Sequence, residues 1–164
     1  MNCYKALKIL LISSSMLCSC TGDFLIETSS ISSCKFEGKK LSSNSTWTQA
    51  DILSVELENN EFTPSLIELE KDKPYILSIS NKDDNIQWFN ADNFLKNSTI
   101  HKIIIDGSVI ESSCPASISV PPNKNSNIYV IPRTSGNYTF SNQNLFLELF
   151  SGGPINLIFV TANK

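Results

Sequence analysis

Apolar and polar side chains alternate with a period of two along much of the chain after residue 50. Residues 53–58 and 75–80 show it most clearly, because every second position is apolar. Such alternation is typical of a strand with one buried face. The stretch 61–94 predicts a strand, a turn, a strand, a turn, a strand and one short helical turn. Further strands are predicted over residues 99–105, 116–120, 127–132, 138–141, 144–150 and 155–161.

Polar runs rich in Gly, Pro, Asn and Asp separate these predicted strands. Short strands between regular turn signals indicate an all-β sandwich. The tripeptide Gly136-Asn137-Tyr138 also resembles a tyrosine corner, in which the phenol binds nearby backbone at a Greek-key crossover. The pattern therefore predicts a Greek-key β-sandwich.

Length and composition narrow the class of protein. A chain of 164 residues is long enough for one domain with a real core, and 41% apolar and 18% charged residues are ordinary for a globular protein. The formal net charge is −3, and no cluster of Lys or Arg is present. A nucleic-acid binder needs a basic face against phosphate, so nucleic acid is not an expected partner.

The first 19 residues have the composition of a secretory signal peptide. Lys5 and Lys8 precede an apolar run that is too short to span a bilayer. The run ends in Leu-Cys-Ser-Cys at residues 17–20, which resembles the lipobox of bacterial lipoproteins. That resemblance implies cleavage before Cys20 and acylation of its thiol, with palmitate as the expected lipid. The alternative is an ordinary signal peptide with an incidental cysteine.

An acylated Cys20 would place the mature protein on a membrane, since each buried methylene contributes about 0.8 kcal/mol. Thr21 follows this cysteine where an aspartate would favour the inner membrane. By resemblance to Gram-negative sorting signals, we expect an outer-membrane anchor and a domain that faces the periplasm. Residues 20–48, rich in Ser, Thr and Asn, predict a flexible tether, and residues 49–164 the sandwich.

Two of the five cysteines remain once the leader is removed and Cys20 is acylated, namely Cys34 and Cys114. In an exported chain, two thiols most simply form a disulfide. This one would close a loop of roughly 80 residues and contribute on the order of 4 kcal/mol. Two free thiols or intermolecular pairing are the alternatives.

The order of residues in 61–94 resembles a cupredoxin, and most closely the cupredoxin-like domains of bacterial periplasmic copper and iron-uptake proteins. In that family, the pattern F-x-P-x-x-I-x-L-x-x-G-x-P-Y-x-L-x-I-x-N-x-D leads to a first histidine ligand and then to A-x-x-F. Asp72 stands where the family has glycine, and Gln87 stands where the histidine is expected. The resemblance covers roughly residues 52–160. The matching residues are Phe62, Pro64, Ile67, Leu69, Pro74, Tyr75, Leu77, Ile79, Asn81, Asp83, Ala91 and Phe94.

A type 1 copper centre needs two histidines, a cysteine thiolate and a weak axial ligand, usually methionine. After the leader, the chain has one histidine, His101, and no methionine. By the resemblance, Gln87 replaces the first histidine and Ser141 replaces the cysteine that closes G-x-Y-x-F-x-C. The apolar run 145–150 occupies the segment that supplies the remaining ligands. We therefore expect no metal site and no cofactor.

Several large apolar residues near the expected ligand loops form a candidate interaction surface, with burial in the core as the alternative. His101 is interpreted as a surface residue, and the chain contains no G-x-S-x-G nucleophile motif, so we do not expect an enzyme. The expected function is a lipid-anchored binding or structural module. The alternative is an accessory metal-handling protein in copper or iron uptake. The candidate surface comprises Trp88, Phe94, Leu145, Phe146 and Phe150.

Overall fold

The computed structural model describes residues 47–110, 115–142 and 155–162, and almost all of these lie in strands or in the turns between them. The predicted all-β class is confirmed. Along the chain, the elements are β1 (Asp51–Glu58), β2 (Glu61–Thr63), β3 (Leu66–Glu70), β4 (Tyr75–Asn81), β5 (Gln87–Asn90), α2 (Asp92–Lys96), β6 (Ser98–Ile105), β7 (Ser108–Ile110), β8 (Ser117–Val120), β9 (Asn125–Pro132), β10 (Gly136–Phe140) and β11 (Asn156–Thr161).

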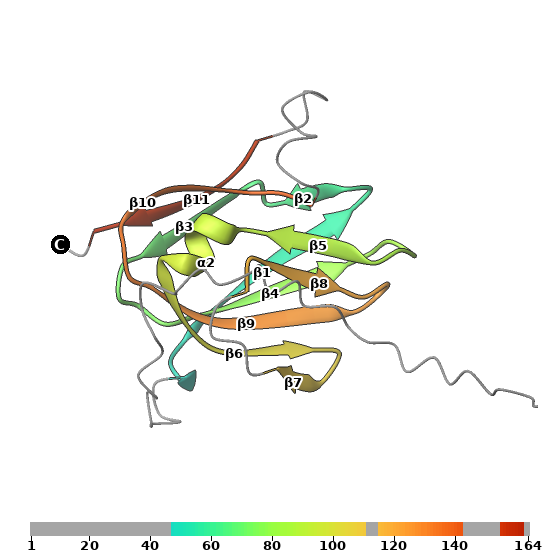
Figure 1. Ribbon diagram of the computed structural model, residues 1–164, viewed down its shortest axis with the longest axis horizontal. Helices are drawn as coiled ribbons and strands as arrows, with labels where there is room; N and C mark the ends of the chain where they lie inside the picture. The colour runs from blue at the N-terminus through green and yellow to red at the C-terminus, as the bar shows by residue number, and fades with distance from the viewer. Residues whose placement is uncertain (1–46, 111–114, 143–154, 163–164) are drawn as a thin grey trace, which may run out of the picture.

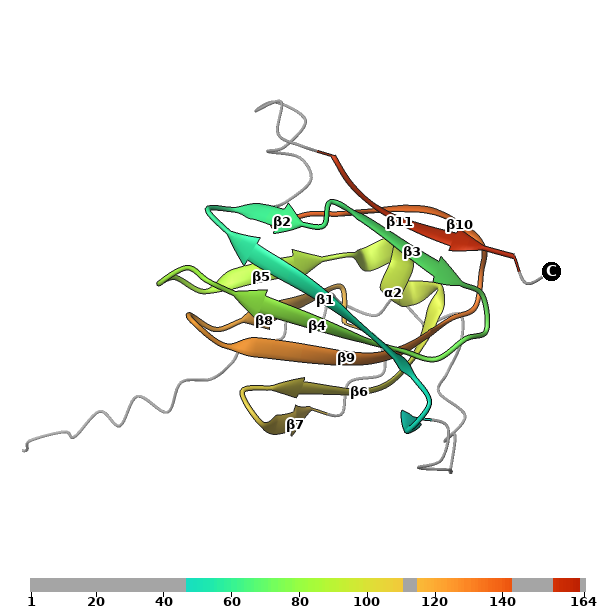
Figure 2. The ribbon, with the colours of Figure 1, turned by 180° about the vertical axis from the view of Figure 1, so that it is seen from behind.

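These strands form three sheets around a common core (Figure 1). The largest has the order β2-β1-β4-β9-β6-β7, and its strands β1 and β4 run parallel. A second sheet, β10-β11-β3, covers one side, and the pair β5-β8 lies in front of the large sheet. The view from behind shows the chain leaving the large sheet after β2 and entering the second sheet at β3 (Figure 2). Neighbours in sequence therefore belong to different layers, as in a β-sandwich.

Alternation in sequence becomes alternation in burial. On β4, Tyr75, Leu77 and Ile79 point into the core, while the residues between them are only half-buried. The predicted helical turn is present as α2, where Phe94 and Leu95 are buried and Lys96 pairs with Asp92 at 2.7 Å. The predicted strand at residues 144–150 lies outside the described residues.

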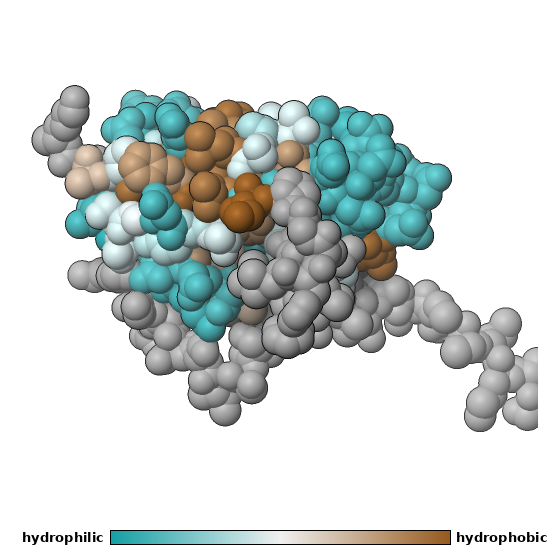
Figure 3. Space-filling view, turned by 90° about the horizontal axis from the view of Figure 1, so that it is seen from above, coloured by the Kyte–Doolittle hydropathy of each residue, from teal (hydrophilic) through white to brown (hydrophobic). Residues whose placement is uncertain are grey.

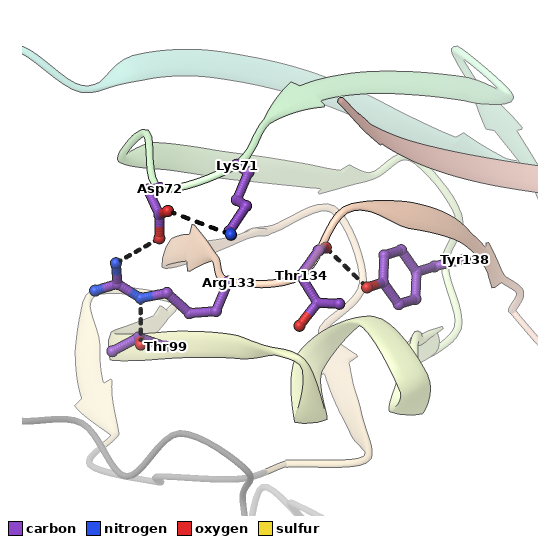
Figure 4. Close-up of polar contacts among 6 residues, drawn as sticks. All are labelled: Lys71, Asp72, Thr99, Arg133, Thr134 and Tyr138. Atoms are coloured by element: carbon purple, nitrogen blue, oxygen red, sulfur yellow. Dashed lines mark hydrogen bonds and ion pairs between the residues drawn. The ribbon is translucent and has the colours of Figure 1, made fainter. Parts of the chain in front are cut away.

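A hydrogen bond confirms the resemblance to a tyrosine corner. The Tyr138 hydroxyl donates to the carbonyl oxygen of Thr134 at 2.9 Å (Figure 4). The ring of Tyr138 packs edge-on against Phe94, with ring centroids 5.7 Å apart. The phenol therefore fixes the turn before β10 while its ring contributes to the core.

Asp72, which stands at the glycine position of the resemblance, has a backbone φ of +62°. This left-handed conformation costs little for glycine and more for a residue with a β-carbon. Local contacts hold it in place: the Asp72 N–H donates to the carbonyl oxygen of Pro132 at 2.8 Å, and Arg133 Nη1 lies 2.8 Å from Asp72 Oδ1. Arg133 Nε also donates to Thr99 Oγ1 at 3.0 Å (Figure 4). The turn after β3 is thereby tied to β6 and β9.

Replacement of Asp72 separates the backbone effect from the ion pair. Asp72→Gly and Asp72→Ala both remove the Arg133 contact, but only alanine keeps a β-carbon at positive φ. We expect Asp72→Ala to be less stable than Asp72→Gly by about 1 kcal/mol. Urea unfolding monitored by circular dichroism measures the difference. Equal stability of the two variants would contradict this account of the turn.

Candidate functional site

Gln87 is the first residue of β5, and its side chain is buried in a network of amides and one carboxylate. Its Nε2 donates to Asp83 Oδ2 at 2.7 Å, and its Oε1 accepts from Asn142 Nδ2 at 2.5 Å. Only 8% of Gln87 is exposed. Burial of an amide is favourable only when its polar atoms have partners, and this side chain has one on each side.

Asn142, just beyond β10, is the centre of this network. Its Nδ2 donates to Asn60 Oδ1 at 2.8 Å as well as to Gln87, and its Oδ1 accepts from the Trp88 backbone N–H at 2.8 Å. Asn60 belongs to the turn between β1 and β2. One side chain thus joins three segments that are far apart in sequence.

Asp83 links the network to the turn between β4 and β5. The Asn59 backbone N–H donates to Asp83 Oδ1 at 2.9 Å, and this bond, with a smaller contribution from Gln87, holds the pKa of the carboxyl below its ordinary value of 3.8. The Asp83 N–H in turn donates to Asn81 Oδ1 at 2.9 Å. Asn81 is buried, and its Nδ2 donates to the carbonyl oxygen of Val120 at 2.9 Å. The network therefore continues into β8.

The sequence-based assignment of the cysteine position needs a correction. Ser141 is buried, but its backbone pairs with Asn90, and N–H to O distances are 3.0 and 2.9 Å in the two directions. The side chain that meets Gln87 belongs to Asn142. Alternation explains this result, because Tyr138, Phe140 and residue 142 point inward together. The spacing G-x-Y-x-F-x-C, counted from Gly136, also ends on residue 142.

The structure describes two of the five residues of the candidate interaction surface, and these two differ in burial. Phe94 is 0% exposed, so its assignment to a surface was wrong, since α2 turns it toward the core. Trp88 is half-buried. Two groups of predicted residues lie outside the described part of the chain: Leu145, Phe146 and Phe150 of the candidate surface, and Cys20, Cys34 and Cys114.

His101 lies apart from the network, on the outer face of the large sheet. The register between β6 and β9 shifts between Ile100 and Lys102, which leaves His101 at a β-bulge. Its ring stacks on Trp47, with centroids 5.1 Å apart. Partial burial, assisted by the charge of Lys102, lowers the pKa of His101. The predicted surface position of this histidine is confirmed.

The side chains at the network do not fit copper. Type 1 copper binds imidazole nitrogen and thiolate sulfur, whereas Gln87 and Asn142 present amides that already bind each other. Within the described ranges, no three His, Cys, Asp or Glu side chains gather where they could hold a metal ion. Residues 143–154 contain no His, Cys or Met. The amide groups of Gln87 and Asn142 hydrogen-bond to each other and so cross-link two segments of the fold.

Solved structures with a similar fold are copper proteins. A multicopper oxidase from Pediococcus acidilactici matches with a TM-score of 0.50 at 16% identity, over 71% of this chain and 27% of the oxidase. A copper nitrite reductase from Nitrosomonas europaea matches with a TM-score of 0.47 at 10% identity, over 68% of this chain and 48% of its own. A copper-binding protein solved in its apo form matches with a TM-score of 0.44 at 16% identity, over 67% and 86%.

The oxidase match shows that the fold of this chain is cupredoxin-like, as the sequence pattern predicts. At this identity it is a statement about fold, and the chain spans only about a quarter of the oxidase. No protein-family model and no curated protein sequence matches the chain. In the part of the chain that the structure covers, no helix has the length and apolar character to cross a bilayer.

Removal of the central amide should destabilise the fold. Asn142→Ala leaves the buried Gln87 Oε1 and the Trp88 N–H without their partner, so we expect a loss of about 1–3 kcal/mol in the free energy of unfolding. The matched control is Asn137→Ala, which removes an exposed asparagine from the preceding strand β10 and should change stability by less than about 0.5 kcal/mol. Urea denaturation of both variants tests the contrast. Equal losses would show that the network does not stabilise the fold.

The lowered pKa of Asp83 predicts a pH dependence. A carboxyl whose pKa is lower in the folded chain stabilises the fold above its ordinary pKa, and that stabilisation is lost as the pH falls through the folded value. Asp83→Asn removes the titrating group, so its unfolding free energy should fall less than that of the wild type between about pH 5 and pH 1. Denaturation midpoints across this range provide the measurement. Parallel curves for the two proteins would contradict the assignment.

Proposed function

We propose that the chain is a lipid-anchored cell-envelope protein whose cupredoxin-like domain has lost type 1 copper and acts as a binding or structural module. The observation that carries the proposal is the hydrogen bond between Gln87 and Asn142. Gln87 stands where the resemblance expects the first histidine, and Asn142 stands where the spacing G-x-Y-x-F-x-C, counted from Gly136, places the cysteine. Both amide nitrogens donate and both amide oxygens accept within the network, and neither side chain is the imidazole or thiolate that type 1 copper requires.

The same contact explains how the fold can persist without a metal. In a copper protein, the ion joins the ligand-bearing segments. Here, Asn142 joins β5, the end of β10 and the turn between β1 and β2 through hydrogen bonds. A fully satisfied buried network can rigidify such a junction. The domain therefore keeps its shape for contacts with other molecules.

A catalytic role has no assembled group to support it within the described residues. His101, the only histidine, stacks on Trp47 on the outer face of the large sheet, away from Asp83. General acid–base or nucleophilic catalysis requires such groups within hydrogen-bond reach of each other. We therefore propose a non-enzymatic role.

Copper binding tests the proposal directly. The full chain, expressed as Cys20→Ala to keep it free of lipid, is incubated with Cu²⁺ and separated from free metal. We expect no stoichiometric copper and no intense thiolate-to-copper absorption band. His101→Gln is the control for adventitious binding by the lone imidazole. One copper per chain that survives this substitution would overturn the proposal and favour the metal-handling alternative.

Anchoring through Cys20 is tested separately. Processing by the lipoprotein pathway requires the thiol, so Cys20→Ala should accumulate as an unprocessed precursor without fatty acid. The wild-type chain should incorporate labelled palmitate and sediment with the outer membrane. Labelled wild-type protein in the inner membrane would correct the sorting prediction alone. Normal cleavage of the variant would refute lipid anchoring.

A further inference from the structure

We infer that the outer face of the β10-β11-β3 sheet is a docking surface for a partner protein that presents apolar side chains next to Lys or Arg. This inference rests on the proposed role as a binding module and assigns that role a surface. The surface, here called the β11 stripe, consists of four large apolar residues with substantial exposure: Leu66 (48%), Ile155 (75%), Leu157 (37%) and Phe159 (41%).

The stripe is contiguous because of strand register. Leu157 and Phe159 are two residues apart on β11 and share its outward face, whereas Ile158 and Val160 point into the core. Leu157 lies directly beside Leu66 of the parallel neighbour β3. Figure 3, which looks down on this side of the molecule, shows apolar side chains gathered between hydrophilic regions. A contiguous apolar area on a soluble domain is typical of a binding surface.

Charge along one border of the stripe indicates the chemistry of the partner. Glu68 lies beside Phe159 in the β3–β11 register, and Glu70 lies beside Thr161. Glu70 pairs with Lys73, but no described cation lies within ion-pair distance of Glu68. The opposite border is neutral, since β10 places Thr139 beside Leu157. A partner with apolar groups and a cation at one edge would complement this arrangement.

The carboxylates along this border also disfavour a second copy of this chain and an anionic membrane as occupants of the β11 stripe. In a two-fold pair of this chain, the interface would contain two copies of Glu68, and the described residues offer neither copy a cation within ion-pair distance. An anionic lipid surface would be repelled by the same carboxylates.

The place where the predicted tether joins the domain is a separate argument against the anchoring membrane as the occupant of the β11 stripe. The described chain begins at Trp47, which stacks on His101 of β6 and meets Tyr129 of β9 edge-on at 5.4 Å. The tether therefore ends on the outer face of the large sheet. The stripe is on a different sheet, and Figures 1 and 2 both show the start of the described chain on the side remote from β10 and β11.

Two labelled peptides of equal length, one of alternating Leu and Lys and one of alternating Leu and Glu, serve as probes for the full-length Cys20→Ala chain. We expect the Leu-Lys peptide to bind and the Leu-Glu peptide to bind at least tenfold more weakly in fluorescence anisotropy. The variant Leu157→Thr/Phe159→Thr keeps strand-forming residues and should lose binding at least tenfold. Its control is Val109→Thr, which removes an apolar side chain that is 59% exposed on β7.

Charge is tested with Glu68→Lys, which should weaken binding of the Leu-Lys peptide, against Glu58→Lys on β1, which should not. Circular dichroism confirms that each variant is folded. The inference is overturned if the Leu-Lys peptide does not bind the wild type, or if it binds the stripe variant and the wild type equally. It is also overturned if the stripe variant instead abolishes a dimer in sedimentation or binding to phospholipid vesicles. None of these outcomes depends on copper or on acylation, so they are distinct from failure of the proposed function.

Discussion

The hydrogen bond between the side chains of Asn142 and Gln87 is the contact on which the loop end of the sandwich depends. Gln87 belongs to β5 and Asn142 lies just beyond β10, and Asn142 adds a third segment through Asn60. In a protein of this fold that binds copper, a metal ion would join these segments. In this chain, hydrogen-bonded amides connect the segments directly.

A second junction connects the sheets at the opposite end of the strands. Asp72 accepts from Arg133, and Arg133 also donates to Thr99, so the turn after β3 is held against β6 and β9. The Tyr138 hydroxyl fixes the next turn. A single exposed ion pair contributes little to stability. Here the ion pair from Arg133 is supported by the hydrogen bond from the Asp72 backbone N–H to Pro132, so both hold the same turn. Both ends of the sandwich are therefore cross-linked by polar side chains around an apolar core.

The two outer faces differ in what covers them. On the large sheet, Trp47 at the start of the described chain packs over His101 and Tyr129, so the chain covers part of this face itself. On the small sheet, Leu157 and Phe159 have no comparable cover among the described residues. The small sheet therefore presents apolar side chains to solvent, whereas part of the outer face of the large sheet is covered.

The all-β class, the helical turn at α2 and the tyrosine corner could be predicted from the sequence, because periods of burial and turn residues are local properties of the chain. The sequence also contains a single histidine, whereas a type 1 copper centre uses two. The contact between Asn142 and Gln87 and the burial of Phe94 in the core could be seen in the folded chain alone, because these contacts join segments that are distant in sequence. The run from Leu157 to Val160 is apolar on both faces of its strand. Its sequence is that of a strand buried on both sides, and only the packing of the sheets leaves one face exposed.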